Sequence, residues 1–74
     1  VLPSKFEVEI DNHWFRSFRV VLEPGVSTTL HRHARPVLTV EVEDGNWVFQ
    51  EAGAEHTLDN PGDAPLELVE IEIR

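Results

Sequence analysis

The sequence predicts an all-β fold, built as one small domain over residues 1–74. Apolar and polar side chains alternate with a period of two along several short segments, which is the spacing of half-buried strands. Turn-forming prolines, glycines, asparagines and aspartates separate these segments at regular intervals, as in β-sandwiches and β-barrels. No segment shows the spacing of an amphipathic helix, so the period of two decides the fold class.

The expected strands follow one another along the whole chain. They cover residues 6–10, 15–22, 28–33, 38–43, 46–50 and 66–73. Phe6, Val8 and Ile10 lie on one face of the first strand. Pro24 and Gly25 end the second strand, because proline fixes φ and glycine readily takes a positive φ.

The fourth expected strand alternates cleanly, with Leu38, Val40 and Val42 on one face. Asp44 and Gly45 then predict a tight hairpin into the fifth strand. In the last strand apolar residues alternate with glutamates, and we expect the glutamates of all strands to lie on a solvated outer face. These glutamates are Glu7, Glu9, Glu41, Glu43, Glu67, Glu70 and Glu72.

The composition is that of a globular protein and excludes several partners. Apolar residues make up 41% and charged residues 27% of the chain, which argues against disorder. The net charge of −8 disfavours nucleic acid, because a phosphate backbone needs a basic face. The longest apolar run is too short to cross a membrane and no leader is evident, so we expect a cytoplasmic protein without membrane contact. The chain has no methionine and begins at Val1, which indicates a trimmed or processed chain or part of a longer one.

A domain of 74 residues has a marginal core. No cysteine is present, so no disulfide stabilises it. The remaining means of stabilisation are a metal ion or a partner subunit.

Three histidines are the candidate metal ligands. His31 and His33 are two residues apart on an expected strand, which places both imidazoles on one face, roughly 7 Å apart at the backbone. His56 lies in a short extended segment and is the candidate third ligand. Neutral imidazole binds zinc, copper, iron and nickel. Taken alone, such a pair of histidines also fits surface or core residues without a metal.

The spacing around these histidines resembles the first cupin motif. Gly25 is followed after five residues by His31 and His33, after four more by Leu38, and after six more by Gly45. The motif has glutamate where this chain has Leu38.

The second cupin motif is matched in the same way. Gly45, Glu51, Gly53, His56 and Asn60 stand at its spacing, with Glu51 in the place of a proline. Because Gly45 ends one motif and begins the other, the segment that usually separates them is absent.

The resemblance implies a small cupin-type, jelly-roll-like β-barrel, shortened by about one hairpin. It implies one divalent transition-metal ion (iron, manganese, nickel, zinc or copper) held by His31, His33 and His56 without the usual carboxylate. It also implies a small-molecule pocket, for which Gln50, Phe49 and Trp47 are the candidate binding residues, although large aromatics are as often core.

The resemblance leaves the activity open. A metal-dependent dioxygenase, isomerase or lyase is one reading, but no general acid or base stands out from the sequence. A non-catalytic small-molecule-binding or sensor cupin, in which any metal is mainly structural, is the alternative. The missing hairpin would leave an open side with unpaired backbone groups, so we expect a homodimer, with or without exchanged strands.

Overall fold

The computed structural model describes residues 5–28 and 30–74, which form seven β-strands and no α-helix. The strands are β1 (Lys5–Asp11), β2 (Phe15–Leu22), β3 (His31–Arg32), β4 (Val37–Glu41), β5 (Trp47–Gln50), β6 (Glu55–His56) and β7 (Leu66–Ile73). The predicted all-β class is therefore confirmed. Residue 29, part of the expected strand 28–33, lies outside the described residues, as do residues 1–4. Within the described ranges no helix has the length and apolar character needed to cross a membrane.

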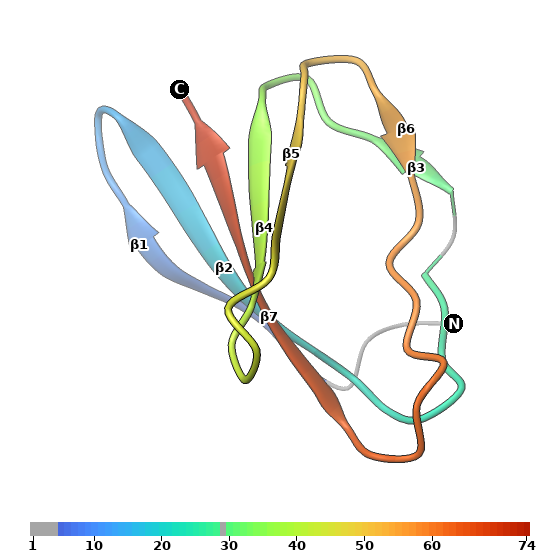
Figure 1. Ribbon diagram of the computed structural model, residues 1–74. Coiled ribbons are helices and arrows are strands. Elements are labelled where there is room, and N and C mark those ends of the chain that lie inside the picture. Colours follow the sequence, from blue (N-terminus) through green and yellow to red (C-terminus); the bar gives the residue numbers. More distant parts are fainter. Residues whose placement is uncertain (1–4, 29) are drawn as a thin grey trace.

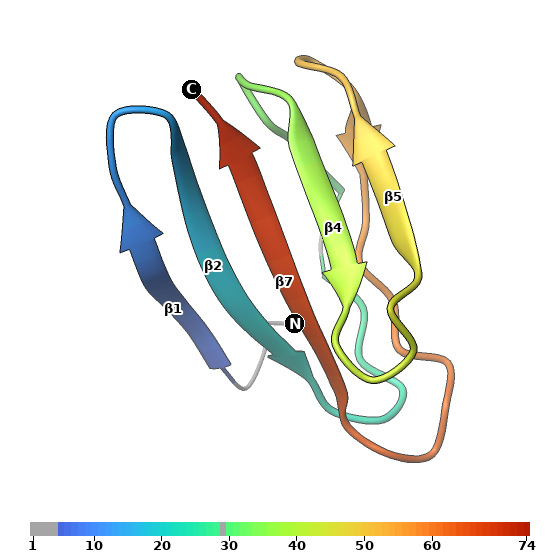
Figure 2. The same ribbon diagram turned by 60° about the vertical axis from the view of Figure 1, so that its left-hand side comes forward.

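The strands form a large sheet and a small ribbon. Five strands make an antiparallel sheet in the order β1-β2-β7-β4-β5, whereas β3 and β6 pair with each other. Figure 2 shows the five strands side by side, and Figure 1 shows the ribbon on the other side of the molecule from β1. The chain leaves the sheet for the ribbon after β2 and again after β5, which brings the two predicted motifs together.

Backbone hydrogen bonds extend the ribbon beyond its two short strands. The Gly25 N–H donates to the Asn60 carbonyl at 2.8 Å, and the Thr28 N–H donates to the Leu58 carbonyl at 2.8 Å. Asn60 anchors the base of the ribbon, because its buried side-chain amide donates to the carbonyl of Leu22 at the end of β2. The residues of the second motif therefore include one, Asn60, whose role here is to hold the turn that leads to β7.

The hairpin between β4 and β5 is confirmed, with a longer loop than expected. The Gly45 N–H donates to the Glu41 carbonyl at 2.8 Å, and Gly45 has a φ of 73°, a conformation that favours glycine. Residues 42–46 connect the two strands, so Val42 lies in the turn and not in the strand as expected.

The apolar core lies between the sheet and the segments that lead to the ribbon. Its buried members are Phe18, Val20, Leu22 and Leu68. Val26, Leu58 and Leu66 are partly buried and pack against them. Three of the four buried residues alternate along β2, which makes β2 the central apolar strand of the inner face.

The faces of β4 and β7 are reversed from the sequence expectation. Glu70 pairs with Phe18 of β2 and Thr39 of β4, so it lies on the inner face of the sheet with the core. It is 3% exposed, which contradicts the expected place of Glu70 on a solvated face. Leu66 and Leu68 share its side of β7 because side chains alternate along a strand. The two leucines decide which side of the strand faces inward.

Apolar residues of β4, β5 and β7 consequently form an outer apolar face. Its members are Leu38, Val40, Trp47, Phe49, Val69 and Ile71, and register pairs join them across the three strands. Trp47 is 67% exposed and Phe49 is 51% exposed. Contiguous exposed apolar surface of this kind marks an interaction site.

We expect the homodimer to form through the outer apolar face, because a small domain with so few buried residues gains stability by covering it. Phe49→Glu places a charge in that face and should yield monomers, as measured by size-exclusion chromatography with light scattering. Val48→Glu is the control, since Val48 neighbours Phe49 on the opposite side of β5 and is 56% exposed. A well-folded wild-type monomer at micromolar concentration would contradict the dimer.

Candidate metal centre

The ribbon positions all three candidate histidines. His31 on β3 pairs directly with His56 on β6, and His33 follows His31 two residues later on the same side of the chain. The Gly53 N–H donates to the His33 carbonyl at 2.8 Å, which fixes the backbone just beyond the end of β3. Gly53 has a φ of 83°, so its place in the second motif has a conformational reason.

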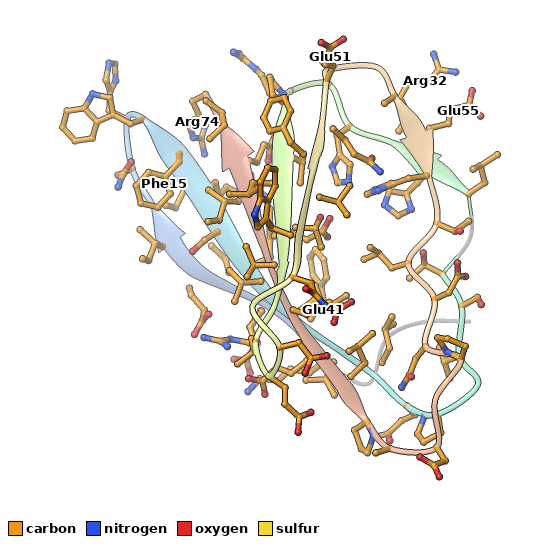
Figure 3. The ribbon with its side chains drawn as sticks, in the orientation of Figure 1. Phe15, Arg32, Glu41, Glu51, Glu55 and Arg74 are labelled. Atoms are coloured by element: carbon orange, nitrogen blue, oxygen red, sulfur yellow. The ribbon has the colours of Figure 1, made fainter. Side chains whose placement is uncertain are left out.

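The alternate residues of the ribbon point away from the histidines. Arg32 and Glu55 are register partners, and their side chains form an ion pair with an N–O distance of 2.6 Å. Figure 3 shows the two side chains together on the ribbon. The ion pair is solvent-exposed, so its contribution to stability is small.

The three imidazoles converge as the sequence predicts. Ring centroids are separated by 4.3 Å for His31 and His56, 4.8 Å for His33 and His56, and 5.0 Å for His31 and His33. One ligand nitrogen from each ring lies within 4.8 Å of the others. Nothing else in the described residues forms a comparable group of potential ligands.

The separations fit a shared ion. The Nε2 atoms of His33 and His56 are 2.9 Å apart. Two donors on one ion at about 2.1 Å are about 3 Å apart when they lie at right angles. The same distance also suits a hydrogen bond between two neutral rings, which is the arrangement expected without a metal.

Burial keeps His56 neutral. Its side chain is 8% exposed. Desolvation lowers the pKa of His56 to about 4, and the positive charges that His31 and His33 can carry lower it further. The neutral imidazole is the form that binds a metal, so His56 is ready to act as a ligand at neutral pH without losing a proton.

A carboxylate lies beside the histidines, although the sequence places none there. The Oε2 atom of Glu70 is 3.7 Å from Nε2 of His33. The Thr39 hydroxyl donates to the same oxygen at 3.5 Å. Burial raises the pKa of Glu70, while His33 and His31 act in the opposite direction. The same parity as Leu66 and Leu68 was the available signal for its inward position.

Leu38, at the position of the motif glutamate, does not face the histidines. It pairs with Ile71 and Phe49 and lies on the outer apolar face. Its neighbours Val37 and Thr39 are the inward residues of β4. A carboxylate at position 38 would therefore point away from the site.

Two hollows adjoin the cluster. A cavity of about 440 Å³ has His31, His33 and Glu70 in its wall, and its other lining residues are Phe6, Val20, Thr28 and Leu58. A smaller hollow of about 180 Å³ reaches His56 from the side of β5. The cluster thus separates a mainly apolar cavity from a more polar one.

The three predicted small-molecule contacts are divided by the structure. Gln50 and Trp47 line the smaller hollow with His56. The Oε1 atom of Gln50 is buried and has no hydrogen-bond partner among the described residues. Phe49 alternates onto the outer apolar face and is absent from the lining of both hollows.

Comparison with known proteins supports the fold. No protein-family model matches the sequence, and no curated protein does. A crystal structure of a cupin domain from Bordetella pertussis Tohama I superposes with a TM-score of 0.75 at 27% identity, over 99% of this chain and 95% of that one. A cupin 2 conserved barrel domain protein from Salinispora arenicola CNS-205 gives 0.62 at 21%, over 89% and 71%. The protein TT1209 from Thermus thermophilus gives 0.65 at 22%, over 97% and 87%.

The chain is thus a small protein with the cupin fold, as the two motifs predict. The Bordetella match spans nearly the whole of both chains, so a similarly short form of the fold occurs there as well.

The metal-free protein should lose stability as the pH falls from 6.5 to 4. Unfolded His56 takes up a proton near its ordinary pKa of 6.5, whereas the folded residue resists protonation until about pH 4. The unfolded state therefore binds more protons in this window, and the loss at its acidic end is about 3 kcal/mol. Urea unfolding across the window measures it, with His56→Gln to remove the contribution of other groups. Equal pH dependence of the two proteins would contradict the assignment.

Proposed function

We propose that this protein binds one divalent transition-metal ion through His31, His33 and His56, and that a small molecule reaches the ion through the adjoining cavity. The convergence of three imidazole nitrogens within 4.8 Å is the observation that carries the proposal. Three neutral imidazoles suit iron, nickel, copper or zinc, and manganese if an oxygen donor joins them.

The residues around the cluster have distinct tasks in this proposal. A bound ion would act as a Lewis acid on an oxygen atom of the small molecule, the chemistry common to metal-dependent dioxygenases, isomerases and lyases. Phe6, Val20 and Leu58 provide an apolar wall that holds the carbon skeleton and excludes water. The unpartnered Oε1 of Gln50 offers a hydrogen-bond acceptor on the His56 side.

A mainly structural ion is the second candidate function. Regular pairing in the ribbon is limited to two residues in each of β3 and β6. An ion that bridges His31, His33 and His56 would tie these strands together and stabilise the fold directly. A small-molecule-binding or sensor protein could use the same arrangement without catalysis.

Metal titration of the chelator-treated protein tests the proposal. Isothermal titration calorimetry with iron(II), manganese(II), nickel(II), zinc(II) and copper(II) should give one ion per chain for at least one of these metals. His31→Ala and His56→Ala should abolish that binding. His13→Ala is the matched control and should leave it unchanged, because His13 is exposed and contacts Trp14 outside the cluster.

Failure of all five metals to bind the wild-type protein would refute the proposal. Thermal unfolding with and without a chelator then separates the two candidate functions. A large fall in melting temperature on metal removal, with no small molecule that binds the metal-loaded protein, favours the structural ion.

A further inference from the structure

Glu70 is a buried carboxylate without a matching lysine or arginine among the described residues. Its side chain is 3% exposed on the inner face of β7. An ionised carboxylate in such a place needs a positive partner, because burial removes its hydration. The Lys and Arg ion pairs found among the described residues all involve other carboxylates: those of Glu7, Glu9, Asp11, Glu55 and Glu67.

The contacts of Glu70 within the chain are weak. The Thr39 hydroxyl lies at 3.5 Å, the outer limit of a hydrogen bond. The Nε2 atom of His33 lies at 3.7 Å, beyond direct hydrogen bonding. Neither contact supplies the charge that would balance the carboxylate when His33 is neutral.

The distance to His33 is that of two ligands on one ion. Donors bound at about 2.1 Å are separated by about 3 to 4 Å, depending on the angle between them. The 3.7 Å separation falls in this range. Glu70 also shares the wall of the larger cavity with His31 and His33, so it approaches the cluster from the sheet while the histidines approach from the ribbon.

We propose that Glu70 is a fourth ligand of the metal ion, supplied by β7 instead of by the motif position on β4. This inference rests on the proposed metal binding. A carboxylate adds negative charge and a hard oxygen donor, which shifts preference toward manganese(II) and iron(II). The ion would then join the ribbon to the middle of the sheet, since β7 pairs with both β2 and β4.

Glu70→Gln is the decisive variant because it keeps the size of the side chain and removes its charge. Manganese(II) affinity should fall about tenfold or more, given that even indirect partners of metal ligands contribute that much. Glu72→Gln is the matched control, since Glu72 lies two residues further along the same face of β7 and borders neither hollow. Its affinity should stay within about threefold of the wild type.

The metal-free proteins provide a second readout with the opposite sign. Without an ion, Glu70→Gln relieves a buried, unpaired carboxylate, so its melting temperature should equal or exceed that of the wild type. With manganese(II) bound, it should be lower. A residue that only maintained the fold would lower the melting temperature in both states.

Zinc titration of the wild-type protein needs no variant. The side-chain carboxyl ¹³C resonance of Glu70 should shift and saturate at one equivalent of zinc(II). An unshifted resonance together with unchanged affinity of Glu70→Gln would overturn the fourth ligand while leaving the three-histidine site intact. Absence of metal binding by the wild type would instead overturn the proposed function itself.

Discussion

The meeting of three imidazoles with a buried carboxylate is the constraint on which the rest of the structure depends. The histidines come from a ribbon with minimal regular pairing, and Glu70 comes from the most interior strand of the sheet. Polar groups of this kind are costly to bury unless they bind one another or an ion. Their placement between sheet and ribbon therefore requires the inner face of β7 to carry a glutamate in line with two leucines.

That requirement determines how both faces of the sheet are used. Since Glu70 and Thr39 face inward, the alternating residues Val69, Ile71 and Leu38 must face outward. The chain thus has one inner face that combines a small core with a polar centre, and one outer face that is largely apolar. A domain that exposes so much apolar surface and buries so few residues has a physical reason to pair with another subunit.

Much of this could be predicted from the sequence. Gly45 and Gly53 adopt positive φ at turns of the fold, so the motif spacing carries real backbone constraints, and these placed His31, His33 and His56 together. The orientation of β4 and β7 could not be predicted in the same way. Their alternation is apolar on one side and acidic on the other, and the usual rule assigns the acidic side to solvent. The rule fails where the interior is a polar site, so it missed Glu70.

The most direct test of the account is a crystal structure of the metal-loaded protein with anomalous diffraction data collected at the absorption edge of the bound metal. The account predicts one anomalous peak per chain within coordination distance of His31, His33 and His56. A peak elsewhere, or none at the cluster in crystals that contain the metal, would contradict it.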